Sequence, residues 1–235
     1  MTRPLPDSHA PKATGPHPAA ASFRHSRYLA ITPPLIALVF ALGLWLALEP
    51  ATLKAFTTEG GLVERPTELL YFALAAVMWW WRRPGDDLLG WAALCIVFVA
   101  FGAREMDLHK AWTGGSMLKL SFYLREAPLV QKLVSGAAVL IVATVGVFLV
   151  RRYARGVWQD FRRGETVATT VAIFVVTMVV SKVFDRSINI LIEDFGVITP
   201  ASTGVLVGAV EEILELSLPL VAAIGFVQHR RGDRS

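Results

Sequence analysis

Three glutamates, Glu211, Glu212 and Glu215, interrupt an otherwise apolar stretch near the C-terminus, within the sequence "GAVEEILELSLP". In a helix, Glu211 and Glu215 are four residues apart and share a face, whereas Glu212 lies about 100° round the helix. Pro219 has no N–H group, so the carbonyl of Glu215 loses its helical partner and can accept another bond or coordinate an ion. Carboxylates in this pattern can bind a cation or act as general acid and base.

Two other charged segments, "REMDLHK" and "SKVFDR", carry the remaining residues with suitable chemistry. Glu105 and His109 are four residues apart, so they could bind one cation together. Arg104, Lys182 and Arg186 could hold an anionic group such as a phosphate. The three segments together predict a site that contains both acids and bases.

Acids outnumber bases in this set, which leaves an excess of negative charge. The acids are Glu68, Glu105, Asp107, Asp185, Glu211, Glu212 and Glu215; the bases are Arg104, Lys110, Lys182 and Arg186, with His109 as the imidazole. Protons on the carboxyl groups, a bound divalent cation, or both could neutralise the excess. The candidate metal ligands are Glu105, His109, Glu211 and Glu215, an oxygen-rich set that suits Mn, Mg, Ca or non-haem Fe better than zinc.

The elements that must position these residues are membrane-spanning helices. The 235-residue chain is 54% hydrophobic with a mean hydropathy of +0.51, which is typical of a polytopic membrane protein. Crossing about 30 Å of hydrocarbon takes about 20 helical residues, so short apolar stretches must extend into charged flanks. The six predicted spans, uncharged except the last, are Tyr28–Leu48, Leu69–Trp81, Leu88–Ala103, Leu133–Val150, Thr166–Ser181 and Thr203–Val227.

The distribution of basic residues predicts the topology. Arginines flank alternate connections, in "WWWRRP", in the loop after the fourth span and after the sixth span, which places both termini in the cytoplasm. We therefore expect an all-α inner-membrane protein with a disordered cytoplasmic tail (residues 1–27), a six-helix domain (28–228) and a short cytoplasmic tail (229–235). The sequence pI of about 9.5 then reflects the cytoplasmic face, and we do not expect nucleic-acid binding.

This topology brings the charged segments to the outer half of the bundle. The glutamates of the sixth span lie roughly 12 to 18 Å from its outer end at helical rise. Residues 107–128 are mixed apolar and basic, and either lie along the outer surface or fold over the bundle as a lid. A line of hydroxyl residues on the fifth span (Thr166, Thr170, Thr177 and Ser181, ending at Asp185) is the one hint of a path through the membrane, although such groups commonly bond to their own helix.

Known glutamate motifs do not match. Carboxylate-bridged di-iron sites need Glu–His pairs three residues apart, and membrane proteases with a double glutamate need a following arginine; both are missing. The combination of "REMDLHK", "SKVFDR" and "EEILEL" resembles a group of uncharacterised bacterial multi-pass inner-membrane proteins over residues 28–228. That resemblance implies that these residues belong together, and it implies no activity.

Three functions from different classes remain open. The first is an enzyme on a lipid or lipid-linked substrate, with Glu105, His109 and the three span-six glutamates in catalysis or cation binding. The second is a cation or proton transporter whose site is formed by the same glutamates. The third is a structural or accessory subunit in which buried ion pairs only fix helix register.

Overall fold

The computed structural model describes residues 25–57, 62–114, 117, 120–124, 127–196 and 200–232, which form helices and no strands. The elements are η1 (His25–Ile31), α2 (Thr32–Ala47), α3 (Pro50–Thr57), α4 (Glu64–Trp80), α5 (Leu88–Glu105), α6 (Leu108–Thr113), α7 (Leu120–Leu124), α8 (Leu129–Arg162), α9 (Thr166–Glu193) and α10 (Ala201–Gly232). The six predicted apolar stretches correspond to η1–α2, α4, α5, α8, α9 and α10. The prediction of an all-α chain is confirmed.

Four helical segments of the described residues are long and apolar enough to cross a membrane, which indicates a membrane protein. They are Tyr28–Ala47, Leu88–Glu105, Leu129–Arg162 and Thr166–Glu193. Helix α4 is not among them because its 17 residues rise only about 26 Å. Helix α10 is not among them either, and three glutamates lower its hydropathy. Length and composition thus identify four candidate spans among the described residues, fewer than the six predicted.

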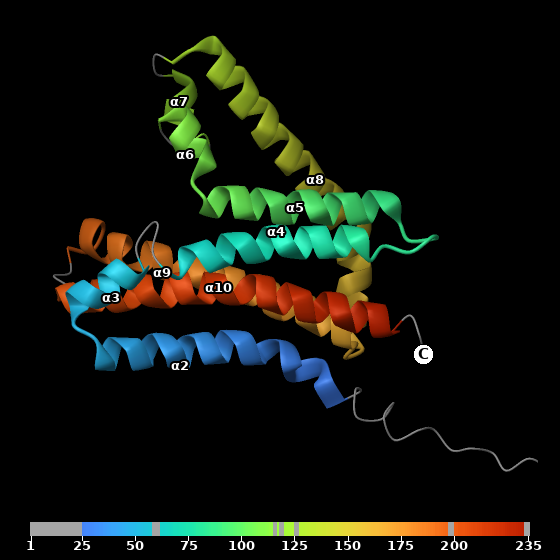
Figure 1. The fold of residues 1–235 in the computed structure, drawn as a ribbon, viewed down its shortest axis with the longest axis horizontal. Helices are drawn as coiled ribbons and strands as arrows, with labels where there is room; N and C mark the ends of the chain where they lie inside the picture. The colour runs from blue at the N-terminus through green and yellow to red at the C-terminus, as the bar shows by residue number, and fades with distance from the viewer. Residues whose placement is uncertain are drawn as a thin grey trace, which may run out of the picture.

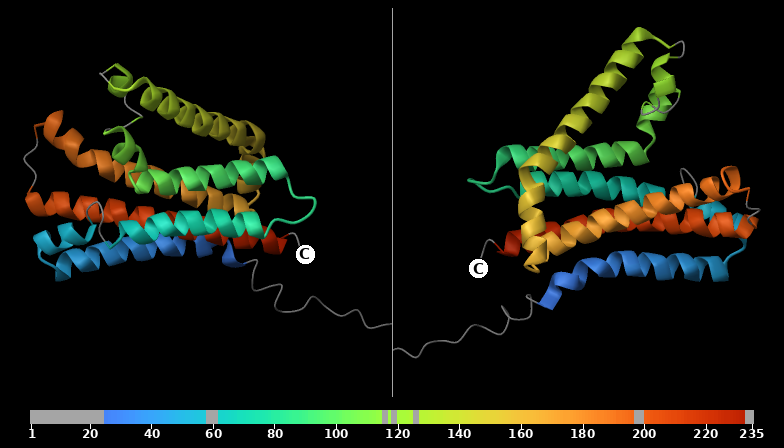
Figure 2. Two further views of the ribbon diagram at one scale, coloured as in Figure 1. Left: turned by 45° about the horizontal axis from the view of Figure 1, so that its top comes forward. Right: turned by 180° about the vertical axis from the view of Figure 1, so that it is seen from behind.

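Helix α10 is the centre of the bundle. It packs along α9 and α2, and also contacts α3 and α4, and Figures 1 and 2 show these helices running side by side along the long axis. One apolar cluster joins Tyr71, Trp91 and Phe98 to Leu218 and Phe226 of α10. A second cluster packs α2 against the middle of α10. Both faces of α10 are thus covered by protein.

Helix α8 leaves the bundle at an angle. Its 34 residues contact α5 and α9 in the part near Arg162, while the opposite part reaches away with α6 and α7 (Figure 1). Short helices α6 and α7 connect the end of α5 to the start of α8, and α6 packs against those two helices. In Figure 1, α6 and α7 lie beside the ends of α5 and α8 and away from α10.

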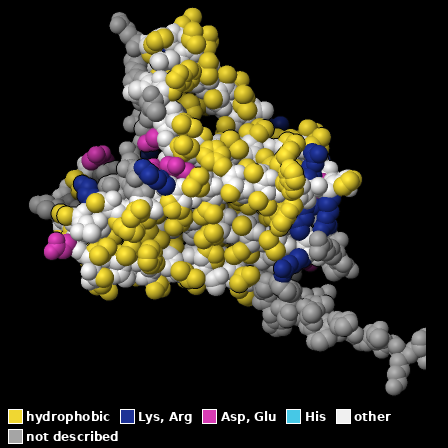
Figure 3. Space-filling model, viewed as in Figure 1, with side chains coloured by type: hydrophobic (Ala, Val, Ile, Leu, Met, Phe, Trp, Pro, Cys, Tyr) yellow, Lys and Arg dark blue, Asp and Glu magenta, His cyan; other side chains and the backbone are white. Residues whose placement is uncertain are grey.

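Charged and apolar side chains occupy different zones of the surface. Figure 3 shows hydrophobic side chains across the middle of the bundle, with Lys and Arg gathered toward the end where α10 terminates. Trp80, at the end of α4, is 85% exposed beside this basic zone. The predicted disordered tail lies outside the described residues except for 25–27, whose backbone begins η1. The last three residues of the predicted C-terminal tail lie outside them as well.

Candidate functional site

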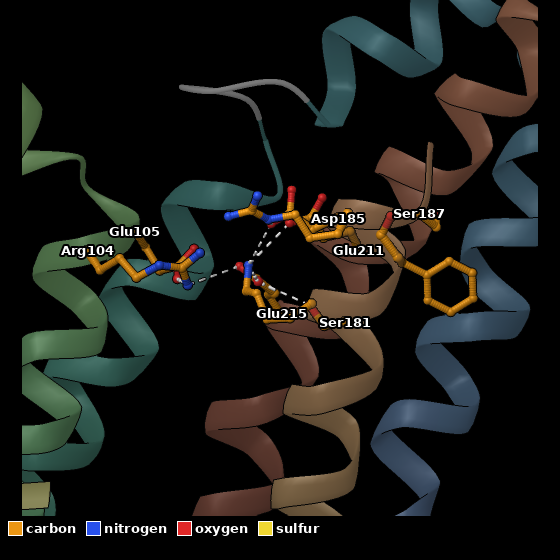
Figure 4. A network of polar contacts seen from close by, with 10 residues as sticks. Arg104, Glu105, Ser181, Asp185, Ser187, Glu211 and Glu215 are labelled. Atoms are coloured by element: carbon orange, nitrogen blue, oxygen red, sulfur yellow. Dashed lines mark hydrogen bonds and ion pairs between the residues drawn. The ribbon is translucent and has the colours of Figure 1, made fainter. Parts of the chain in front are cut away.

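The centre of the candidate site is Glu215 of α10, whose side chain is only 6% exposed. Lys182 of α9 forms ion pairs with Glu215 and, at 3.3 Å, with Glu211. The Ser181 hydroxyl, fully buried, donates to Glu215 Oε1 at 3.0 Å. Because Glu211 and Glu215 are one turn apart on the face packed against α9, one lysine reaches both carboxyl groups (Figure 4).

Helix α5 adds a base and an acid from the opposite side. Arg104 Nη1 lies 2.8 Å from Glu105 Oε1 and 3.8 Å from Glu215 Oε2. Figure 4 shows Arg104 and Glu105 extending from α5 toward Glu215. The carboxyl groups of Glu105 and Glu215 therefore share one guanidinium nitrogen.

The exposed rim of the cluster is formed by Asp185 and Arg186. Asp185 lies 3.9 Å from Lys182 Nζ and 4.0 Å from Arg186 Nε, and the Arg186 side chain is 76% exposed. The ion cluster is defined here as Arg104, Glu105, Lys182, Asp185, Arg186, Glu211 and Glu215. Four acids face three bases, so one proton on any of the carboxyl groups would make the ion cluster neutral.

The structure does not bring all the predicted site residues together. Glu68 lies near the start of α4, where its charged neighbours are Glu64 and Arg65. Asp107 sits in the turn after α5 with a left-handed φ of 47°. The side chains of His109 and Lys110 lie outside the described residues. Within the described residues, no group of three or more His, Cys, Asp and Glu side chains is arranged to hold a metal ion; of the predicted ligands, His109 lies outside that search.

Glu212 faces away from the ion cluster, as its position about 100° round the helix predicts. Its side chain instead lines a groove between α3 and α10, together with Lys54. Its charged neighbours are the acids Glu64, Glu105, Glu211 and Glu215. Among the described residues, Glu212 forms no ion pair. The three glutamates of α10 therefore belong to two separate sites.

The predicted hydroxyl line on α9 faces inward along α10. Thr170, Thr177 and Ser181 are 2%, 6% and 0% exposed. Thr170 Oγ1 donates to Gln228 Oε1 of α10 at 2.6 Å, and Ser181 bonds to Glu215 as described above. These two hydroxyls bond across to the neighbouring helix rather than to their own backbone. Thr170 and Ser181 are eleven residues apart, which is about 16 Å at helical rise.

Sequence reasoning missed Tyr71, which lies in the apolar core of α4 at 2% exposure. Its phenol is close enough to feel the charges of Glu105, Glu215 and Arg104. It stacks on Phe98 with ring centroids 6.3 Å apart. An aromatic residue in an apolar span carries no sequence signal for such a role, because packing gives the same pattern.

A second charged contact, also missed, closes the opposite end of the bundle. Asp86, in the turn after α4, accepts a hydrogen bond of 2.7 Å from Arg230 of α10, whose guanidinium lies 4.4 Å from the Trp91 ring centroid. That bond lowers the pKa of Asp86 below its ordinary value. The neighbouring Asp87 accepts a hydrogen bond from the Tyr153 hydroxyl of α8 at 2.5 Å, which lowers its pKa too. These contacts tie the α4–α5 turn to α8 and α10.

Comparison of the chain with protein-family models, with curated proteins and with solved structures gives no match. The class of protein therefore follows from the helices and the two sites alone.

Proposed function

We propose that the chain is a six-span protein of the bacterial inner membrane with both termini in the cytoplasm. Helices α4 and α10 lie alongside the apolar helices α5 and α9, so a bilayer that covers one member of each pair also covers the other (Figure 1). Arg83 follows α4, Arg163 follows α8, and Arg231 lies in the last turn of α10, all at the same end of the bundle, which supports a cytoplasmic location for that end. The ion cluster then lies in the outer half of the membrane.

The function that the geometry supports best is proton binding and transfer by a proton or cation transporter. The observation that carries the proposal is the excess of one carboxyl group over the bases of the ion cluster, around a Glu215 side chain that is 6% exposed and paired with Lys182. One proton balances this buried cluster, and its loss would leave one uncompensated negative charge for a cation or another proton to neutralise. Such a site changes charge by one when it binds or releases a proton.

The buried hydroxyl line on α9 supplies the cytoplasmic half of the route. Thr170 bonds to Gln228 near the cytoplasmic end, and Ser181 bonds to Glu215 in the ion cluster. Hydroxyl groups both donate and accept hydrogen bonds, so they can pass a proton along water molecules that enter between them. The cytoplasmic halves of the spans carry few charged side chains, so in this proposal the α9 hydroxyls are the polar groups along which a proton would move.

Proton flux in proteoliposomes tests the proposal. An imposed pH gradient, with and without added monovalent or divalent cations, is expected to decay faster with the wild-type protein than in empty vesicles. The variant Glu215→Gln removes the central carboxylate, so the flux should fall to the level of empty vesicles. Glu193→Gln is the matched control, because Glu193 is an exposed acid at the last residue of α9, at the end of that helix nearer to the ion cluster. Equal decay with wild-type protein and empty vesicles would end the transport proposal.

The second candidate is an enzyme that acts on a lipid or lipid-linked substrate. The observation that favours it is the exposure of two bases at the ion cluster, Arg104 at 44% and Arg186 at 76%, where an anionic headgroup could bind. Elemental analysis of the purified protein beside a Glu211→Gln/Glu215→Gln variant tests its cation-dependent form. A stoichiometric metal that the variant loses would favour this enzyme over proton transfer.

The structural role is the remaining alternative. It predicts that cluster variants lower stability while no gradient, cation or lipid substrate changes any property of the wild-type protein. A flux that Glu215→Gln abolishes and Glu193→Gln preserves would contradict it.

A further inference from the structure

The last part of α8, residues 151–162, crosses the end of the bundle. Figures 1 and 2 show it running steeply across the long axis before the chain turns back into α9. This is the end of the bundle that we place in the cytoplasm. Because the spans run along the long axis, the last part of α8 lies along the cytoplasmic membrane surface. A helix in that orientation meets lipid headgroups along its length.

Contacts with the turn before α5 fix the orientation of this segment. Arg152 Nε donates a hydrogen bond of 2.8 Å to Asp87 Oδ2, and the Tyr153 hydroxyl donates to the same oxygen. Both side chains therefore point toward the bundle. At about 100° of rotation per residue, Trp158 lies on the opposite side of the helix from the middle of this pair. The side of α8 around Trp158 thus points away from α5.

The side that points away carries three arginines around the tryptophan. We define the outward face of α8 as Arg151, Arg155, Trp158 and Arg162, which are spaced by four, three and four residues. All four side chains are exposed, Trp158 at 61%. None of the three arginines forms an ion pair with a described residue, and Asp160, the one acid of the segment, lies 3.9 Å from Arg163 instead. The outward face therefore has three positive charges that the described protein does not compensate.

An apolar groove begins beside this face and runs toward the middle of the membrane. This α2–α9 groove encloses about 350 Å³, within the range of roughly 300–1,000 Å³ that ligand pockets occupy. Phe161, the neighbour of Arg162, lines its cytoplasmic end, and Val180 and Leu214 line its inner end. Its lining along α9 begins at Thr169, so it extends for about 16 Å of helix. The two threonines of the lining aside, the groove is apolar, as an acyl chain requires.

The outward face and the groove meet at one pair of aromatic rings. Trp158 stacks on Phe161 with ring centroids 6.0 Å apart, so the tryptophan of the face contacts the residue at the mouth of the groove. Positive charge thus lies at the membrane surface, and apolar space lies directly inward from it. A phospholipid of the cytoplasmic leaflet has the same order, with its phosphate at the surface and its acyl chains toward the centre.

We propose that an anionic phospholipid of the cytoplasmic leaflet binds here, with its phosphate at the outward face of α8 and one acyl chain in the α2–α9 groove. Arginine guanidinium groups donate paired hydrogen bonds to phosphate oxygens, and tryptophan is favoured at the level of the headgroups. A choline lipid adds a positive charge that three arginines repel, so the face selects a lipid with net negative charge. This inference rests on the proposed cytoplasmic location of this end, and it does not depend on proton transfer at the ion cluster.

Native mass spectrometry of the purified full-length protein tests the assignment. The protein in detergent is titrated with dioleoyl phosphatidylglycerol, with dioleoyl phosphatidylcholine, and with glycerol phosphate as the soluble headgroup. Three variants accompany the wild type. Arg162→Gln removes one charge from the outward face, and Arg163→Gln, the matched control, removes the same charge from the next residue, which is paired with Asp160. Ala172→Leu fills part of the α2–α9 groove without a change of charge.

We expect the wild type to bind phosphatidylglycerol about ten-fold more tightly than phosphatidylcholine. Arg162→Gln should lower the affinity for phosphatidylglycerol about five-fold, the effect of one arginine beside anionic lipid, and Arg163→Gln should change it less than about two-fold. Ala172→Leu should weaken the binding of both lipids and keep the preference between them.

Equal affinity of the wild type for the two lipids would overturn the proposal, and so would equal losses in Arg162→Gln and Arg163→Gln, which would show that only total charge matters. Glycerol phosphate that binds as tightly as the lipid, or lipid binding that Ala172→Leu leaves unchanged, would remove the acyl chain from the groove. The titration uses no ion gradient, so failure here leaves the proton-flux result untouched, and absence of proton flux leaves the lipid preference to be measured.

Discussion

Removal of the Lys182 ammonium tests whether the ion cluster is a single interacting unit. In Lys182→Met, a side chain of similar length loses the charge that contacts Glu215, Glu211 and, at 3.9 Å, Asp185. The Glu215 side chain is 6% exposed, so water cannot replace the lost partner fully. Arg104, at 3.8 Å from Glu215, is then the remaining base near that carboxylate.

The expected cost follows from burial. Removal of one partner of a fully buried ion pair typically costs about 3–5 kcal/mol. Lys182 itself is 36% exposed, and solvent screens part of its interaction, so we expect about 2–3 kcal/mol. For a chain of this size, 1 kcal/mol shifts the midpoint of thermal unfolding by about 2–4 °C. The midpoint should therefore fall by about 4–12 °C.

Thermal unfolding of the detergent-purified protein near neutral pH measures this cost. Lys132→Met on α8 is the control, since the Lys132 side chain makes no ion pair with a described residue, and its effect should stay within about 0.5 kcal/mol. The double variant Lys182→Met/Glu215→Leu should recover more than half of the loss, because an apolar pair replaces an ion pair at little cost. A Lys182→Met midpoint equal to that of the control, or a double variant whose loss is the sum of the two single losses, would refute the reasoning.

Two further predictions concern the ends and the interior of the helices. Asp86→Asn should lower the unfolding midpoint near neutral pH and remove a pH dependence of the wild type. Because Arg230 lowers the pKa of Asp86, the stability that this contact adds is present above the ordinary aspartate pKa and is lost as the pH falls through the lowered pKa. Melting curves of the wild type and the variant between pH 7 and pH 3 measure this difference. Gly102→Leu should destabilise the protein by about 1–3 kcal/mol in the same assay, because a Cβ at that position already lies 2.9 Å from the Phe72 ring, whereas Gly208→Leu in the open groove should be nearly neutral.

The helices were predictable because each span has a long apolar signal. The short predicted stretches extend into charged flanks as helical rise requires: the fifth stretch ends at Ser181 in the prediction, whereas α9 continues to Glu193. The four-residue spacing of Glu211 and Glu215 likewise predicted that they share one face of the helix, and α9 packs on that face. Local spacing was sufficient for these features.

Long-range contacts set the limit of that reasoning. Asp86 and Arg230 are 144 residues apart, and nothing in either segment indicates their pairing. The groove at Glu212 depends on α3, an eight-residue helix that no apolar stretch marks. Glu68 has Glu64 and Arg65 as its charged neighbours near the start of α4, whereas Tyr71, three residues further on, lies in the apolar core.

The position of α10 explains how a helix with three glutamates can lie among apolar spans. It contacts α2, α3, α4 and α9, so protein surrounds most of its surface and lipid little of it. Glu211 and Glu215 then meet Lys182 and Arg104, while Glu212 faces a groove with a lysine on its rim. Because the two faces differ in available bases, Glu211 and Glu215 form ion pairs within the protein, whereas Glu212 forms none with a described residue.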